Sequence, residues 1–115
     1  MTVSDTRLAQ IAARFSQLEA RLASGTLEGA EFIAASRDYA ELEPVARAAA
    51  SVSAARREIA DLEAMLSDPE MKAMAEEELA ELRATLPEAE HALAIAMLPR
   101  DVADSRSAML EIRAG

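Results

Sequence analysis

The residues that could carry out chemistry are few in this sequence and do not form a recognisable set. His91 is the only histidine, and a histidine that acts as a general base or metal ligand needs partner side chains beside it. On a helical wheel, His91 projects away from the apolar positions Leu82, Leu86 and Leu93. We therefore interpret His91 as an exposed surface residue.

Three other groups of residues resemble sites but do not have the required arrangement. The acids Glu76–Glu78 are consecutive, and neighbours on a helix point about 100° apart, whereas a hard cation needs converging oxygens. Arg113–Gly115 is not a phosphate loop, because it has no glycine-rich run and no lysine. Met65, Met71 and Met74 are interpreted as core-filling residues, with an adaptable binding surface as the alternative. The sequence thus assigns no catalytic, cofactor-binding or metal-ligating residue, leaves partner-binding residues open, and does not predict an enzyme.

Composition indicates an all-α domain. The chain has 115 residues, 51% of them hydrophobic but only 3% aromatic, and it contains no tryptophan and no cysteine. Such a composition favours a small helical bundle over a sandwich or barrel, and it excludes disulfides and thiolate metal sites. The first residues show no basic region followed by an apolar run, and no apolar run reaches membrane-spanning length. We expect a cytoplasmic protein.

The negative charge is concentrated in one segment. The whole chain carries a net charge of −9, and residues 58–90 alone contain eleven acids against Lys72 and Arg83, so the remainder is balanced. An acidic surface repels phosphate, so we expect no direct nucleic-acid grip from this segment. The simplest interpretation is a solvated helix face, and the alternative is a surface for a basic protein partner.

Two apolar stripes predict an antiparallel helical hairpin. Residues 52–66 and 71–97 each carry apolar side chains at steps of three and four. Leu62 and Leu79 lie about equally far from the intervening turn, so we expect them to pack against each other. Pro87 lies inside the second stripe but does not interrupt its register. We therefore expect one bent helix with a kink next to this proline.

The turn between the two stripes contains helix-capping residues. Asp68 suits an N-cap position, and Pro69 suits the first position of the following helix. If the N-cap is instead placed one residue earlier, at Ser67, then Ser67 and Glu70 form a capping box. Because proline disfavours a helical conformation at the preceding residue, the first helix is expected to stop by Ser67.

The part of the chain before the hairpin predicts two further helices. Ser4 or Asp5 caps the first, which ends at residues 23–25 with Gly25 in a left-handed conformation. Thr26 is expected to cap the second helix, and Pro44 to end it and to begin a third helix that runs to residue 66. The apolar faces of the first two helices are Leu8, Ile11, Phe15, Leu18 and Leu22, then Phe32, Ala35, Tyr39 and Leu42.

The last residues differ in character from the helices. Pro99 and the polar residues 101–107 are expected to end the last helix and form a linker. Ala108–Arg113 alternates apolar and charged residues, which is typical of a half-buried strand. A single strand is not stable alone, so we divide the chain into a helical domain, 1–98, and a linker with the start of another domain, 99–115.

Four segments resemble the bacterial peptide chain release factor 1 family. They are Ala35–Leu42 (ASRDYAEL), Met65–Ala75 (MLSDPEMKAMA), Leu98–Asp101 (LPRD) and Leu110–Gly115 (LEIRAG). Their order and spacing are similar to the start of that family along nearly the whole chain. The related factor for the other stop-codon pair differs from LPRD near the domain boundary, which favours the first factor.

The resemblance implies an accessory domain of a class I translation termination factor. Members of the family recognise UAA and UAG through a tripeptide in a central domain and hydrolyse peptidyl-tRNA with a Gly-Gly-Gln motif, and neither motif occurs here. Their N-terminal helical domain lies near the stalk base of the large ribosomal subunit and takes part in the interplay with the recycling GTPase. The resemblance assigns no contact residue within the domain.

If the resemblance to release factors is set aside, the residue pattern alone favours a different function. Amphipathic stripes of this kind also occur in generic helical interaction modules and in small coiled coils that oligomerise. In that alternative, the apolar stripes would face other copies of the chain or a basic protein partner rather than one another.

Overall fold

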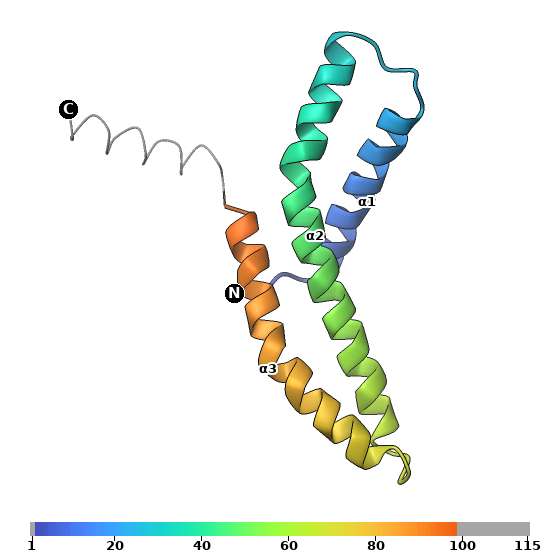
Figure 1. Cartoon of the computed structure of the whole chain (residues 1–115), viewed down its shortest axis with the longest axis vertical. Helices are drawn as coiled ribbons and strands as arrows, with labels where there is room; N and C mark the ends of the chain where they lie inside the picture. Colours follow the sequence, from blue (N-terminus) through green and yellow to red (C-terminus); the bar gives the residue numbers. More distant parts are fainter. Residues whose placement is uncertain (1, 99–115) are drawn as a thin grey trace, which may run out of the picture.

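A computed structural model describes residues 2–98, and these residues form three helices (Figure 1). They are α1 (Asp5–Ala23), α2 (Ala30–Met65) and α3 (Lys72–Ala96). The long α2 is the shared partner, since α1 folds back along its first half and α3 along its second half. The predicted all-α class and the helical hairpin are confirmed. None of the described helices is long and apolar enough to cross a bilayer.

The ends of α1 agree with the sequence prediction. The Ser4 hydroxyl accepts a hydrogen bond from the Arg7 backbone N–H at 3.1 Å, which is the N-cap arrangement. At the other end, Gly25 has φ +72°, a left-handed conformation that glycine adopts without steric cost. The chain can therefore leave α1 and turn back at once towards α2.

The prediction that Thr26 caps α2 is wrong. The Thr26 hydroxyl lies 2.9 Å from the Ser24 hydroxyl, and the Thr26 N–H donates to the same Ser24 oxygen. These bonds hold Thr26 to the end of α1, so α2 begins later, at Ala30. Gly29 precedes it at the N-cap with φ +55° and makes no side-chain cap.

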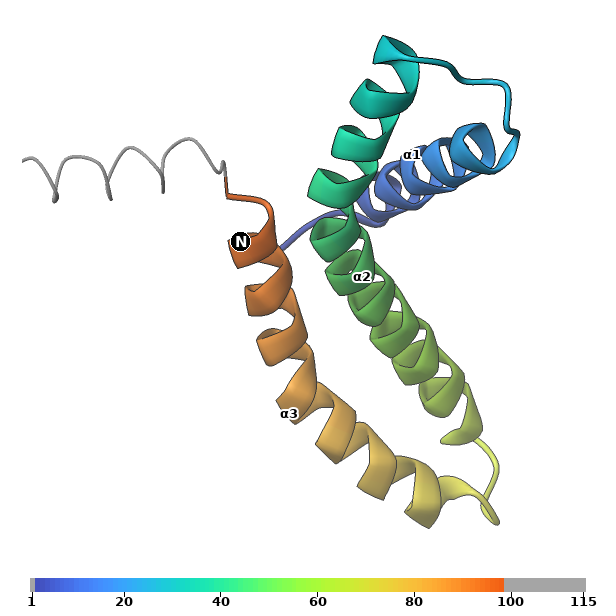
Figure 2. The ribbon, with the colours of Figure 1, turned by 45° about the horizontal axis from the view of Figure 1, so that its top comes forward.

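The predicted break at Pro44 is also wrong. The proline lies inside α2, which runs without interruption for 36 residues, roughly 54 Å. A proline in a helix interior removes one hydrogen bond, but buried residues on both sides of it (Ala35 before, Ala49 and Val52 after) hold the two halves of α2. The missing hydrogen bond leads to a bend in α2 rather than a break, and the bend is seen between the cyan and green parts of α2 in Figures 1 and 2.

The turn before α3 is capped differently from the predicted capping box. The Ser67 hydroxyl donates back to the Ala64 carbonyl at 3.1 Å, and the Glu70 N–H that a capping box would pair with it donates to Asp68 instead. The prediction that Asp68 is the N-cap of α3 is wrong, because the N-cap is Met71 and has no side-chain cap. Asp68 instead closes the preceding turn: its carboxylate accepts from the Glu70 N–H at 3.0 Å, and its carbonyl accepts from the Lys72 N–H at 2.9 Å. The regular helix begins at Lys72, a few residues later than predicted.

The predicted bent arm is confirmed. Pro87 lies inside a continuous α3 of 25 residues, and the helix curves towards α2 along its length (Figure 2). The Thr85 hydroxyl donates to the Leu82 carbonyl at 3.2 Å just before the proline. The apolar register continues through the bend, because Leu79 and Leu93, one on each side of Pro87, are both buried.

The helices enclose two separate apolar clusters. The first, here called the junction core, takes residues from all three helices, whereas the second, the arm core, takes them from α2 and α3 only. Leu62 and Leu79 lie together in the arm core, as predicted. The junction core is Leu8, Ile11, Ala49, Val52 and Leu93, and the arm core is Leu62, Ala75 and Leu79.

The last predicted elements lie outside the described residues. These are the linker after Pro99 and the strand-like segment Ala108–Arg113. The boundary at residue 98 between two domains therefore stays a prediction. What the structure does describe is the end of α3 at Ala96, with Met97 as its C-cap.

Candidate functional site

Arg56 links the start of α1 to α3 at the point where all three helices meet. Its Nη1 donates to Asp5 Oδ1 at 2.8 Å, and its Nη2 donates to Glu90 Oε2 at 3.0 Å. Asp5 is the first residue of α1, and Glu90 lies in α3, so one α2 side chain links both neighbouring helices. A planar guanidinium suits this role, because it presents two donors in fixed directions.

The two contacts of Arg56 differ in strength. Hydrogen bonding to Glu90, and next to Asp5, raises the pKa of the Arg56 guanidinium above its ordinary value, so it stays charged. The Arg56 and Glu90 side chains are only 20% and 23% exposed, whereas Asp5 is 87% exposed. Water screens the Asp5 pair more strongly, so the bond to Glu90 contributes more to the junction.

Beneath Arg56, the junction core fixes how the two hairpins are arranged. Val52, one turn before Arg56, is fully buried between Leu8 and Ile11 of α1 and Leu93 of α3. Close-packed side chains of this kind resist displacement. The junction is therefore a structural joint that sets the angle between the α1–α2 and α2–α3 hairpins.

An open groove runs between the start of α1 and the middle of α2. It has a volume of about 640 Å³, and alanines from both helices form most of its wall. Its charged residues are Asp5, Arg56 and Arg57, of which the first two are already paired. This set provides no general acid and base pair and no nucleophile beside a base.

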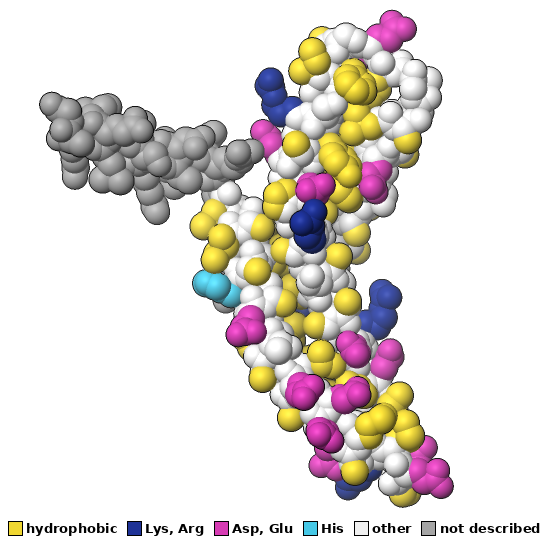
Figure 3. All heavy atoms as spheres, in the orientation of Figure 1, with side chains coloured by type: hydrophobic (Ala, Val, Ile, Leu, Met, Phe, Trp, Pro, Cys, Tyr) yellow, Lys and Arg dark blue, Asp and Glu magenta, His cyan; other side chains and the backbone are white. Residues whose placement is uncertain are grey.

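The acidic segment 58–90, here called the acidic arm, forms the lower half of the molecule. Acidic side chains gather over this part in Figure 3, on both α2 and α3. Arg83 donates to Glu63 at 2.8 Å across the two helices, and both side chains are more than half exposed. One such surface pair neutralises little of the arm, so its outer surface keeps a strong negative potential.

The structure places most residues singled out from the sequence on the surface. His91 is exposed, as predicted, and so are the acids Glu76–Glu78. Met65 packs against the arm core and Met71 is half-buried, whereas Met74 is 41% exposed, so the core-filling prediction is wrong for Met74. Within residues 2–98 there is no cluster of three or more His, Asp or Glu that could hold a metal, and residues 113–115 lie outside the description.

Sequence reasoning missed the Arg56 junction. A signal was present, because Arg56 lies between Val52 and Ile59 at helical steps of four and three, in the apolar register of α2. A charge at such a position implies a partner of opposite sign. Neither Asp5, 51 residues away, nor Glu90, 34 residues away, could have been identified from spacing.

Comparisons with known proteins agree on one family. The PCRF domain family matches residues 11–115. The chain is 73% identical to the peptide chain release factor 1 of Novosphingobium aromaticivorans and 70% identical to that of Erythrobacter litoralis, over 115 residues each. These alignments cover the whole of this chain but only 32% of each relative, so the chain spans about a third of their length. No solved structure matches the chain.

Proposed function

Since the chain belongs to the PCRF domain family, we propose that it is the accessory N-terminal helical domain of a class I translation termination factor. The observation that carries this proposal is the 73% identity, along the entire chain, to a peptide chain release factor 1. In this proposal, the parent protein acts in the cytoplasm on ribosomes stopped at UAA or UAG.

The architecture supports a docking role rather than a chemical one. The described residues form two hairpins held at a fixed angle by the Arg56 junction. The α1–α2 groove has no acid–base pair, and the acidic arm extends away from the junction (Figure 1). A rigid bent body of this kind can hold the remainder of a longer factor at a set distance from a binding surface.

The partner in this proposal is the ribosome, more specifically the region near the stalk base of the large subunit. The recycling GTPase is the second proposed partner. The negative potential of the arm argues that its contacts are with protein rather than with the phosphate backbone of ribosomal RNA.

The alternative of a self-associating coiled coil is less well supported. Its premise is that the apolar stripes are free to meet other copies. In the structure these stripes face one another within a single chain, because Leu62 of α2 and Leu79 of α3 are buried in one cluster.

A peptide-release assay tests the proposal. Residues 1–115 would replace the matching N-terminal third of the Novosphingobium relative, and release of labelled formyl-methionine would be measured on ribosomes at UAA, UAG and UGA. We expect the chimera to release peptide at UAA and UAG. The isolated chain should release none, because it contains no Gly-Gly-Gln motif.

Two outcomes would contradict the proposal. Codon-dependent release by the isolated chain would place chemistry in this domain. A chimera that folds, as judged by circular dichroism, but no longer stimulates release would mean that the chain cannot replace the domain it resembles. The matched control is the same exchange made with the corresponding segment of the Erythrobacter relative.

A further inference from the structure

One outward stripe of α3 is exposed from end to end. Its residues follow one another at alternating steps of three and four, so they lie on a single side of the helix. Leu98 continues the stripe past the end of α3, because its N–H still bonds to the Ile95 carbonyl at 3.1 Å. The outer stripe consists of Met74, Glu77, Glu81, Ala84, Glu88, His91, Ile95 and Leu98, all exposed.

The two ends of the outer stripe are apolar. Met74 is 41% exposed, Ile95 54% and Leu98 66%, and these are all the large apolar side chains that α3 and the two residues after it expose. Three such side chains scattered over a helix would need no explanation, but here they share one face. This arrangement is typical of a helix face that another helix covers.

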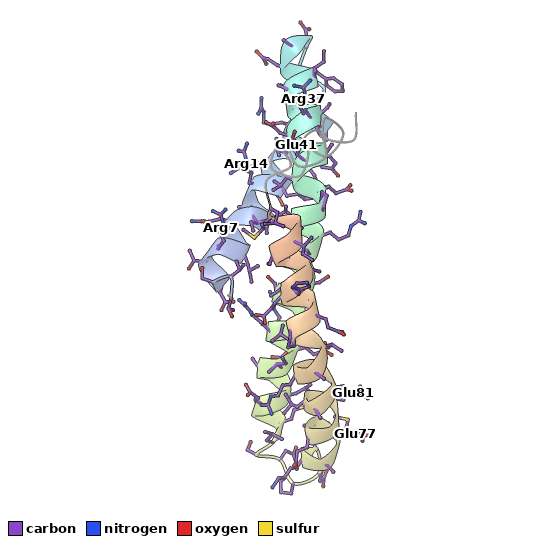
Figure 4. The ribbon with its side chains drawn as sticks, turned by 90° about the vertical axis from the view of Figure 1, so that its left-hand side faces the viewer. Arg7, Arg14, Arg37, Glu41, Glu77 and Glu81 are labelled. Carbon is purple, nitrogen blue, oxygen red and sulfur yellow. The ribbon has the colours of Figure 1, made fainter. Side chains whose placement is uncertain are left out.

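The middle of the outer stripe is acidic. Within residues 2–98, none of the ion pairs includes Glu77, Glu81 or Glu88. Figure 4 shows Glu77 and Glu81 pointing away from α2, on the side of α3 opposite the arm core. Their charges are therefore available to a partner that approaches from outside.

We propose that the outer stripe docks a helix of a basic protein partner. The partner helix would carry apolar side chains at both ends, against Met74 and against Ile95 and Leu98, with lysines or arginines opposite the acids between them. Salt bridges across helices in this arrangement select the partner and its orientation. This inference is independent of the proposed function, because it depends only on the surface of α3.

Charge complementarity decides between a basic partner and a second copy of the chain. If two copies met through this stripe in parallel, each acid would face the same acid of the other copy. In an antiparallel pair centred on the midpoint of the stripe, residue 86, Glu77 would face Ile95 and Glu88 would face Ala84, so these acids would lie against apolar side chains without a countercharge. Like charges at close range oppose association, whereas a basic helix relieves the repulsion.

A synthetic helical peptide tests the proposal. The probe has 25 residues, the length of α3, with leucines placed to meet the apolar ends and lysines placed to meet the acids. A scrambled peptide of identical composition is the first control. Binding to the full 115-residue chain would be measured by isothermal titration calorimetry at about 0.1 M salt, where surface electrostatics are already screened beyond about 10 Å.

Two charge-reversed variants separate the outer stripe from the acidic arm as a whole. Glu77→Lys with Glu81→Lys should weaken peptide binding about tenfold or more. Glu58→Lys with Asp61→Lys makes the same change in net charge on exposed positions of α2 in the same arm, and it should change the affinity less than about twofold. Ile95→Ser should also weaken binding, without affecting the charge. Circular dichroism verifies that every variant folds.

Four results would overturn the proposal. Equal binding of the scrambled peptide, or equal weakening by the α2 variant, would show that only net charge attracts the probe. Failure of the designed peptide to bind at all would remove the docking role. A concentration-dependent dimer in light scattering, lost in the Glu77→Lys and Glu81→Lys variant, would assign the stripe to a second copy instead.

Discussion

Replacing Leu79 by alanine tests whether the arm is held by its own core. The Leu79 side chain is 2% exposed and packs with Leu62 and Ala75. Truncating a buried leucine costs about 2–5 kcal/mol in the free energy of unfolding. Here we expect the lower half of that range, because the arm core is a single layer in which the half-buried Leu66 and Leu82 can close in. A domain of this size has only about 5–15 kcal/mol in total.

Urea denaturation and thermal melts followed by circular dichroism measure the effect of Leu79→Ala. A loss of about 2–3 kcal/mol corresponds to a fall in Tm of roughly 10–20 °C. Hydrogen exchange shows which part of the molecule is destabilised. Amides of the arm should lose protection before those of α1, because the arm core and the junction core are separate.

The control for Leu79→Ala is Glu77→Ala, on the outer face of the same helix. Its effect should stay within about ±0.5 kcal/mol, because it removes an exposed side chain that belongs to neither core. Equal small shifts for the two variants would refute the reasoning. They would mean that α2 and α3 are not held together by the contact between Leu62 and Leu79.

Three further predictions concern the junction, the first turn and the end of the chain. Arg56→Met should lower stability by about 1 kcal/mol, whereas Arg57→Met, on the exposed side, should not, as urea denaturation can measure. The pKa of Arg56 is raised, so the stabilisation that its charge provides is fully present below the unfolded-state pKa. It is lost only as the pH rises through the folded-state pKa. Stability measured between about pH 6 and 9 should therefore show no change from this group. Gly25→Ala should cost about 1 kcal/mol in the same assay, since alanine is strained at φ +72°. Deleting Val102–Gly115 should leave Tm nearly unchanged, because both cores lie within residues 2–98; a fall of several degrees would move the domain boundary.

Local signals in the sequence predicted the local structure well. The Ser4 cap, the left-handed Gly25 and the pairing of Leu62 with Leu79 each depend on residues close to a helix end or to a turn. Period and capping chemistry act over a few residues, so the sequence alone is enough to identify them.

One error arose where tertiary packing overrides a local preference, and another where one local hydrogen bond replaces the expected one. Pro44 is a helix breaker by local rules, yet packing on both sides keeps α2 continuous and converts the break into a bend. Thr26 has the chemistry of a cap, but its hydroxyl is already bonded to Ser24. Neither outcome follows from the composition of the segment concerned.

The functional features were the least predictable. The excess of acids in residues 58–90 was evident from the sequence, but the joining of Asp5 and Glu90 through Arg56 needs the fold. Likewise, Met74, Ile95 and Leu98 become a common surface only when α3 is seen with its inner face occupied by the arm core and the junction core. Sequence separation conceals such groupings until the helices are placed.

In the proposed function, this domain positions a termination factor on the ribosome and takes no part in the chemistry of peptide release. The most direct test measures release kinetics of the chimera with and without residues 2–98, as a function of ribosome concentration. We expect removal to raise the ribosome concentration needed for half-maximal release and to leave the maximal rate of release unchanged. A lower maximal rate at an unchanged half-saturating concentration would contradict the proposal.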